Sequence, residues 1–279
     1  MSARSEPGLR APRSLQRFSF NQATAKHWPL ADAVAGCVAA GVPGIGLWRE
    51  PVAEYGLARA ARLVRDAGLA VTSLCRGGFF TADGWREENL RAIEEAATLG
   101  TGVLVLVCGG LPPGSRDIDG ARRRVTDAIA ELAPHAAAAG VTLAIEPLHP
   151  MFCADRCVVA TLGQALDIAE RFDPGLVGVV VDAYHVWWDD TAYAQIARAG
   201  ARIAAFQVCD WVTPLPEGVL LGRALPGEGC IELRRLREAV DAAGYTGPVE
   251  VEVFSAQVWA RPGLDVLDDS IEGYLRHVV

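Results

Sequence analysis

Four residues whose side-chain oxygens could bind a metal lie at or near the ends of short apolar runs in the second half of the chain. VTLAIE ends at Glu146, LVGVVVD at Asp182 and IAAFQ at Gln207, and PVEVEVF carries Glu252 near its end. Carboxylates in apolar surroundings carry a large desolvation cost unless they are paired or bound to a cation. Three carboxylates and a carboxamide form a hard, oxygen-only set that suits Mn²⁺ or Mg²⁺ and, less well, Co²⁺ or Zn²⁺. The pattern predicts one divalent metal site, with Mn²⁺ favoured. The alternative is that one or two of these acids pair with arginines.

The elements that must position these residues repeat along the chain. Three features recur in the same order: an Ala-rich amphipathic stretch, a small residue followed by glycine where a helix would end, and a short run rich in β-branched residues. AAGVTLAIEP and DAGLAVTSLC are two examples. Glycine after an apolar helix is a common C-cap, and continuous apolar runs suit parallel strands buried on both faces. The expected strands are 16–21, 44–48, 69–74, 102–108, 141–146, 176–182, 202–208 and 248–254. The expected helices are 30–41, 54–67, 85–99, 117–139, 161–171, 189–199, 231–243 and 265–277.

Eight such units predict a single (β/α)8 barrel over residues 16–279, preceded by a flexible tail over residues 1–15. A doubly wound open sheet is the alternative. In a barrel the active site forms at the carboxyl ends of the strands, where the four ligands would meet. His149 and His185 each follow a ligand by three residues, and Trp48 ends the second strand. Arg76 follows the third strand, so these four side chains are predicted to bind substrate.

Composition excludes several classes of function. A net charge of −8 argues against a nucleic-acid-binding surface, which needs a basic face, and no apolar run is long enough to span a membrane. Lys26 is the only lysine and follows the first strand, which excludes a Schiff-base aldolase with its lysine inside the barrel. No apolar signal segment opens the chain and the seven cysteines show no paired metal-binding spacing, so we expect a cytoplasmic protein.

At the predicted ligands the chain resembles the xylose-isomerase-like TIM-barrel superfamily of sugar phosphate isomerases and epimerases. That superfamily includes ketose 3-epimerases, hydroxypyruvate isomerase and the inosose isomerases and dehydratases. The motifs are IEPLHP, VDAYH, FQVCDW, PGEGCIEL and VEVEVF, and the resemblance covers residues 16–277. It implies one metal held by Glu146, Asp182, Gln207 and Glu252. It also implies that His185, Arg223 and Asp210 act on the substrate.

The residues support an isomerase or epimerase acting on a keto-sugar, a cyclitol or a small hydroxy-keto compound. A chelated metal would stabilise the enediolate formed by proton removal next to a carbonyl. Glu146 and Glu252 are the predicted acid and base on opposite faces of the reacting carbon. A metal-dependent dehydratase or lyase is the first alternative, and a non-catalytic sugar-binding or accessory subunit is the second. The expected partner is the small-molecule substrate, and tryptophan-bearing loops are compatible with a homo-oligomer.

Overall fold

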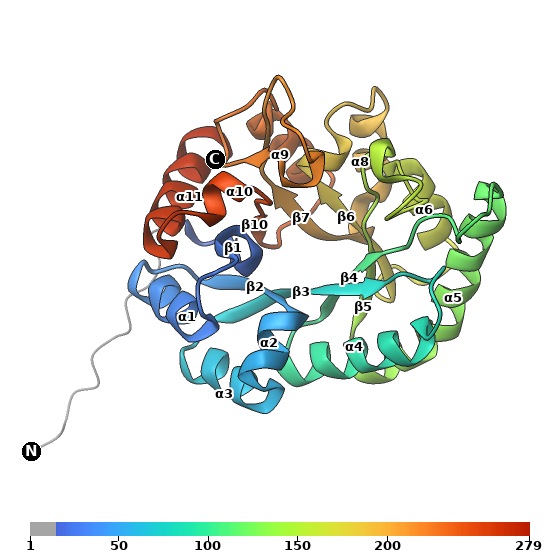
Figure 1. The fold of residues 1–279 in the computed structure, drawn as a ribbon, viewed down its shortest axis with the longest axis horizontal. Coiled ribbons are helices and arrows are strands. Elements are labelled where there is room, and N and C mark those ends of the chain that lie inside the picture. The colour runs from blue at the N-terminus through green and yellow to red at the C-terminus, as the bar shows by residue number, and fades with distance from the viewer. Residues whose placement is uncertain (1–14) are drawn as a thin grey trace, which may run out of the picture.

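The apolar runs form a closed ring of parallel strands with helices outside it (Figure 1). The computed structural model describes residues 15–279, and the predicted (β/α)8 barrel is confirmed. Neighbouring strands in the ring are parallel, and β1 closes it by pairing with both β2 and β10. The ring consists of β1 (Phe18–Asn21), β2 (Gly44–Trp48), β3 (Ala70–Gly78), β4 (Val103–Val107), β5 (Thr142–Ile145), β6 (Val177–Asp182), β7 (Ile203–Val208) and β10 (Val249–Val251). The predicted tail lies outside the described residues except for Leu15, which is buried.

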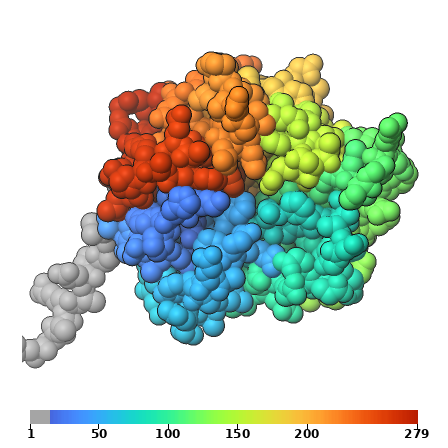
Figure 2. Space-filling model, in the orientation of Figure 1, coloured from blue at the N-terminus to red at the C-terminus, as the bar shows by residue number. Residues whose placement is uncertain are grey.

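Helices cover the outside of the ring (Figure 1), and the C-terminal helix contacts the first helix. In Figure 2 the red C-terminal part of the surface borders the blue N-terminal part. The helices are α1 (Leu30–Ala39), α2 (Arg49–Tyr55), α3 (Leu57–Asp66), α4 (Trp85–Leu99), α5 (Ile118–Ala139), α6 (Leu162–Ala169), α7 (Ala183–Val186), α8 (Ala192–Ala199), α9 (Leu233–Ala242), α10 (Ala256–Trp259) and α11 (Gly263–His277). Short 3-10 turns are η2 (Gln22–Ala25), η3 (Pro150–Phe152), η4 (Gly200–Arg202) and η5 (Val219–Leu221). Within residues 15–279, no helix combines the length and the apolar character that a membrane crossing requires.

Several expected boundaries differ from the structure. The last strand of the ring, expected over 248–254, spans only Val249–Val251. The predicted helix 54–67 is two helices, α2 and α3, because Gly56 adopts a φ of 93° between them. The third strand was expected to end at residue 74, but β3 continues to Gly78. Arg76 therefore lies inside a strand rather than in the loop after it, which corrects the expected position. Its backbone is held in the barrel wall close to the mouth.

The long helix α5 shows how local sequence defines an element. Asp117 Oδ1 accepts the backbone N–H of Gly120 at 2.7 Å and caps the first turn. Gly140 ends the helix with a φ of 67°, which glycine adopts without strain. Apolar residues spaced by three and four positions face the barrel, namely Ala121, Val125, Ala128, Ile129, Leu132 and Ala136.

The strands present one face to the helices and the other to the barrel interior. On β1, Phe18 packs edge-on against Tyr274 of α11, with ring centroids 5.0 Å apart. The alternate residues Ser19 and Asn21 face inward, and Ser19 Oγ is hydrogen-bonded to Thr72 Oγ1 at 2.7 Å. The interior therefore holds polar side chains, and these lie below the mouth of the barrel.

A buried carboxylate, Glu250, organises this interior. It accepts hydrogen bonds from side chains of three other strands: Asn21 Nδ2 at 2.7 Å, Thr72 Oγ1 at 2.7 Å, Ser73 Oγ at 2.9 Å and Gln207 Nε2 at 3.0 Å. Gly46 on β2 leaves room for the carboxylate, because a Cβ there would lie 2.5 Å from Glu250 Oε2. The four partners prevent Glu250 from moving aside.

We expect Gly46→Ala to lower the free energy of unfolding by about 1–3 kcal/mol, the usual cost of overpacking a core. Urea denaturation measures the change. Gly175→Ala is the matched control, since Gly175 is exposed and a Cβ there meets nothing within 4 Å. Equal unfolding free energies for the two variants would show that the Glu250 carboxylate is not held in place.

Candidate active site

The four predicted ligands are buried together at the carboxyl end of the barrel, each at most 5% exposed. Asp182 is the last residue of β6 and pairs in register with Gln207 on β7. Glu146 follows β5 directly, and Glu252 follows β10. Ligand atoms of Glu146, Asp182 and His185 lie within 4.8 Å of one another. The end of the barrel therefore holds a compact acidic and histidine cluster that a metal ion could occupy.

Arg223 lies among these acids. It belongs to β9 (Arg223–Ala224), which pairs antiparallel with β8 (Asp210–Trp211) above the ring. Its Nη1 donates to Asp182 Oδ2 at 3.0 Å and to Glu252 Oε2 at 3.1 Å. The guanidinium carbon lies 4.8 Å from the ring centroid of Tyr184 and 5.0 Å from that of Phe254. Two of the acids thus pair with an arginine, as the alternative interpretation of the sequence proposed.

One guanidinium does not balance the charge of this cluster. Three ionised carboxylates and Arg223 leave a net charge of −2 in a buried volume. Burial and the neighbouring acids raise the pKa of Glu146 well above its ordinary value. Burial also raises the pKa of Asp182, and it raises the pKa of Glu252 to about 8 although Arg223 opposes the shift. A divalent cation would supply the missing positive charge and favour the ionised carboxylates.

His185 is held as a neutral imidazole in this cluster. The backbone N–H of His149 points at its Nδ1 at 3.0 Å, and Arg223 Nη2 lies 3.0 Å from its Nε2. Both neighbours are hydrogen-bond donors, so neither can accept a hydrogen bond from a ring N–H, and an imidazolium would have two such N–H groups facing donors. Burial, together with the charge of Arg223, lowers the pKa of His185 well below its ordinary value. His185 can therefore offer a nitrogen lone pair but does not carry a positive charge at neutral pH.

Gln207 provides the test of whether the donors fit a cation. A carboxylate only accepts hydrogen bonds, so the Gln207 amide turns its Nε2 towards Glu250. This leaves Gln207 Oε1 buried and without a hydrogen-bond partner among residues 15–279. A buried carbonyl oxygen in that state costs about 1–3 kcal/mol, which coordination to a cation would recover. The set of oxygen donors, with His185 beside it, therefore fits a divalent cation.

A small hollow opens above the acids, with about 30 Å³ of free volume. Its walls include four residues predicted to act on the substrate, namely Trp48, Arg76, His185 and Arg223. His149 stands outside it, half-buried between Trp188 and Trp211 with ring centroids 5.2 and 5.1 Å away. Burial lowers the pKa of His149. The structure thus places His149 behind the hollow, next to His185.

Asp210, which the resemblance implies acts on the substrate, uses both carboxylate oxygens for contacts within the protein. Its Oδ1 accepts the backbone N–H groups of Trp211 and Ile231, both at 2.9 Å, and its Oδ2 accepts that of Gly227 at 2.9 Å. Both oxygens are therefore used to hold the segment 224–231 under β9. Asp210 positions the loop that carries Arg223 rather than facing the hollow.

The family model described as the xylose isomerase-like TIM barrel matches residues 34–276. The chain belongs to this family. A 3-dehydroshikimate dehydratase of Pseudomonas aeruginosa is 30% identical over 84% of this chain and 37% of that protein. An inosose isomerase of Halalkalibacterium halodurans is 28% identical over 56% of this chain and 56% of that protein. The chain thus spans between about a third and somewhat over half of the length of these relatives.

A solved structure of this fold, protein SMc04130 of Sinorhizobium meliloti, is 48% identical with a TM-score of 0.92. The match covers 95% of this chain and 99% of that one. The curated relatives of the chain are isomerases, epimerases and dehydratases of the xylose isomerase-like family. The resemblance stated from the sequence is confirmed.

Two polar residues of this family member were not singled out from its sequence. Glu250 orients Gln207, and Asn21 donates to Glu252 Oε1 at 3.1 Å while its own Oδ1 accepts the indole N–H of Trp48. The signal for Glu250 is the alternation in VEVEVF, which places it two residues before Glu252 on the same face of the strand. Asn21 is the last residue of the first strand, so the search for polar residues at strand ends that found the acids could also have found it.

We expect the metal-free protein to lose about 1 kcal/mol of unfolding free energy between pH 7 and 8.5 through Glu252. Its carboxyl pKa is about 8 in the folded state, against an ordinary value of 4.5. In this interval the folded state holds a proton that the unfolded state has lost, so rising pH favours unfolding. Urea denaturation of protein treated with a chelator measures the slope.

Glu252→Gln is the control, because it removes the titrating group and keeps a side chain of similar size. The opposite effect of His185, whose pKa is lowered, operates below its ordinary pKa of 6.5 and outside this interval. An unchanged slope in Glu252→Gln would contradict the assignment of the raised pKa to this carboxyl.

Proposed function

We propose that the protein is a divalent-metal-dependent isomerase or epimerase of a keto-sugar, a cyclitol or a small hydroxy-keto compound. The observation that carries this proposal is the buried group of three carboxylates whose charge Arg223 only partly balances. The isomerases and epimerases among the relatives support the reaction class. The acids lie at the carboxyl ends of the strands, where barrel enzymes carry out their chemistry.

Glu146 and Asp182 of the compact cluster, Gln207 with its unpartnered Oε1, and Glu252, which Arg223 joins to Asp182, are the residues that would hold the metal. Their oxygen donors favour Mn²⁺. A divalent cation bound there would act as a Lewis acid towards a carbonyl oxygen of the substrate. His185 borders the same acids, with its Nε2 3.8 Å from Asp182 Oδ2. It is an additional candidate ligand, or a neutral partner for a substrate oxygen.

Glu146 and Glu252 are the groups that would move the proton. In the ring, β6 and β7 separate β5 from β10, so the two carboxylates approach the mouth from different sides. One carboxylate would take the proton from the carbon next to the carbonyl, and the other would return a proton. Return to the opposite face of the same carbon gives epimerisation, and return to the neighbouring carbon gives isomerisation. Carboxylates that reach a bound carbon from two sides can act as general base and general acid in turn.

Arg223 would orient the substrate from above these acids. Its guanidinium is fixed by two carboxylates and two aromatic rings, and it lines the hollow beside Trp48 and Arg76. Guanidinium groups donate to substrate oxygens in a rigid geometry. Trp48 offers an apolar ring face on the other side, to which the C–H face of a sugar can pack.

A dehydratase is the second candidate, and the 30% identity to a 3-dehydroshikimate dehydratase favours it. Such an enzyme would use the same removal of a proton and then expel a hydroxyl group with the help of an acid. The neutral state of His185 is unfavourable for that acid role, because its pKa is lowered well below the ordinary value. The mass of the product separates the two reactions, since only the dehydratase forms a product that has lost water.

The test is a screen of ketoses, inososes and hydroxy-keto acids with Mn²⁺ in deuterated water. We expect deuterium to enter the substrate at the carbon next to the carbonyl during turnover, as measured by NMR. Glu146→Gln should lower the exchange rate at least about a hundredfold, the scale of general acid–base catalysis. Glu131→Gln on α5 is the matched control, because Glu131 is a surface residue paired with Arg86.

Turnover with full retention of the substrate hydrogen would contradict proton removal and favour a hydride shift. Equal exchange rates in Glu146→Gln and Glu131→Gln would exclude Glu146 from the reaction. Chelation of the metal should abolish exchange, and Mn²⁺ should restore it in the wild-type protein.

A further inference from the structure

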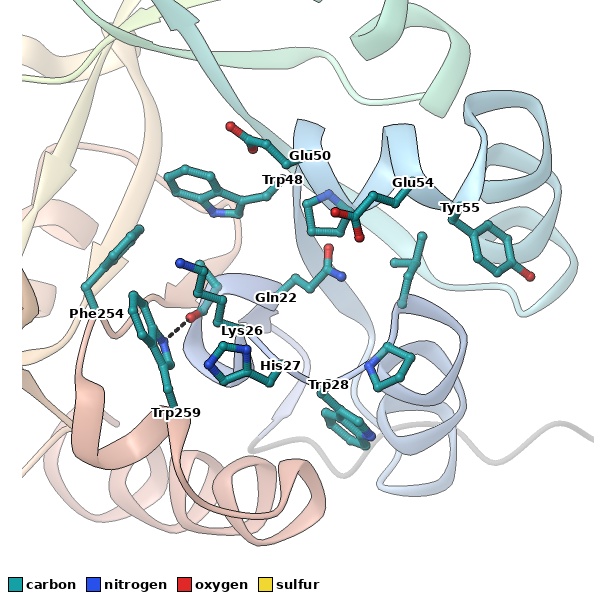
Figure 3. A pocket seen from close by; sticks show the side chains of 14 residues that line it. Gln22, Lys26, His27, Trp28, Trp48, Glu50, Glu54, Tyr55, Phe254 and Trp259 are labelled. Carbon is teal, nitrogen blue, oxygen red and sulfur yellow. Dashed lines mark hydrogen bonds between the residues drawn. The ribbon is translucent and has the colours of Figure 1, made fainter.

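A second, larger cavity adjoins the mouth of the barrel (Figure 3). It has a volume of about 730 Å³ and lies between η2, the beginning of α2 and the short helix α10. Trp48 and Phe254 line both this cavity and the hollow above the acids. We call it the outer pocket. The outer pocket shares these two wall residues with the hollow of the candidate active site, and its other lining residues come from different segments.

The two spaces differ greatly in size. The hollow above the acids, with about 30 Å³, has room for a water molecule or two. The outer pocket, with about 730 Å³, falls in the range of about 300–1,000 Å³ typical of sites for drug-sized ligands. A free monosaccharide with its reacting carbons at the acids would leave most of the outer pocket empty. The volume therefore suits a ligand larger than a monosaccharide, with a second group that extends into the outer pocket.

Three aromatic side chains form a fixed wall of the outer pocket. Trp48 packs against Phe254 with ring centroids 5.3 Å apart, and Phe254 packs against Trp259 at 5.7 Å. The Trp48 indole N–H donates to Asn21 Oδ1 at 2.9 Å, and that of Trp259 donates to the carbonyl of Ala23 at 2.7 Å. Both indole donors are thus used within the protein. What these rings offer a ligand is their faces, to which the C–H faces of sugar rings pack well.

Polar groups complete the outer pocket. Lys26 Nζ lies 4.6 Å from the ring centroid of Trp259, and Figure 3 shows its ammonium group pointing towards the space between Trp48 and Phe254. Lys26 takes part in none of the ion pairs formed among residues 15–279. Glu50 and Glu54 also line the pocket, and Figure 3 shows Glu50 beside Trp48 and Glu54 nearer Tyr55. A ligand here would meet aromatic faces, one cationic donor and two carboxylate acceptors, which suits a ring that carries several hydroxyl groups.

We propose that the outer pocket binds the distal ring of a glycoside, so that the substrate is a two-ring keto-sugar. The reacting ring would face the acids, and the second ring would pack on Trp259, Phe254 and Trp48 with Lys26 donating to its oxygens. This inference rests on the proposed function for the identity of the reacting ring. The binding of a second sugar ring can be measured without any turnover.

The experiment compares the binding of cellobiose and D-glucose by isothermal titration calorimetry in the presence of Mn²⁺. We expect the wild-type protein to bind cellobiose at least about tenfold more tightly than glucose, which corresponds to 1.4 kcal/mol. Trp259→Ala should abolish this preference. Lys26→Met should reduce it severalfold, and because Lys26 is exposed this variant does not threaten folding. Trp85→Ala, at a half-buried tryptophan of α4 outside the outer pocket, should leave the preference unchanged.

Equal binding of the two sugars by the wild-type protein would overturn the inference. A preference that survives in both Trp259→Ala and Lys26→Met would overturn it as well. If the preference depends on these residues but no keto-sugar exchanges deuterium, the outer pocket stands and the proposed function fails. If a free monosaccharide is turned over and neither variant alters the binding of either sugar, the proposed function stands and the inference fails.

Discussion

The structure depends on a concentration of negative charge inside an apolar barrel. Glu146, Asp182 and Glu252 lie together at the mouth, each nearly fully buried, with Arg223 as the cation among them. Such an arrangement destabilises a fold unless the charge is balanced, because desolvation of each ion costs several kcal/mol. Burial is the main reason that the pKa values of these carboxyls are raised, and the neighbouring acids add to the shift of Glu146 and Glu252. Buried acids that are retained despite this unfavourable desolvation energy are typical of functional sites.

The barrel supports this charge by a second polar layer below it. Glu250 collects donors from three strands and turns the Gln207 amide so that its oxygen is left for another partner. Asn21 connects the layers, because its Nδ2 donates to both Glu250 and Glu252. Arg223 lies on β9 above the ring, and Asp210 of the paired strand β8 holds the segment after β9 through the backbone N–H groups of Gly227 and Ile231. The acids are therefore positioned from below by strands and from above by a loop.

Much of the fold was predictable because most strands are short runs rich in apolar and β-branched residues, and the helices have a regular apolar face. The acids could be placed for the same reason, since a carboxylate at the end of such a run must lie at the mouth of the barrel. The position of Arg223 between the acids could not be predicted, because it depends on the pairing of β8 with β9, a two-residue contact without periodic signal. The role of Asp210 depends on the same loop. The division of α2 from α3 follows from the backbone of Gly56 alone, which a helical periodicity does not reveal.

The most direct test is a crystal structure grown with excess Mn²⁺, in which anomalous scattering locates the metal. The account predicts one manganese peak within about 2.5 Å of side-chain oxygens of Glu146, Asp182, Gln207 and Glu252. Arg223 Nη1 should then have moved away from at least one of the two carboxylates that it now joins. A saturated crystal with no manganese among these oxygens, and with Arg223 still joining Asp182 to Glu252, would contradict it.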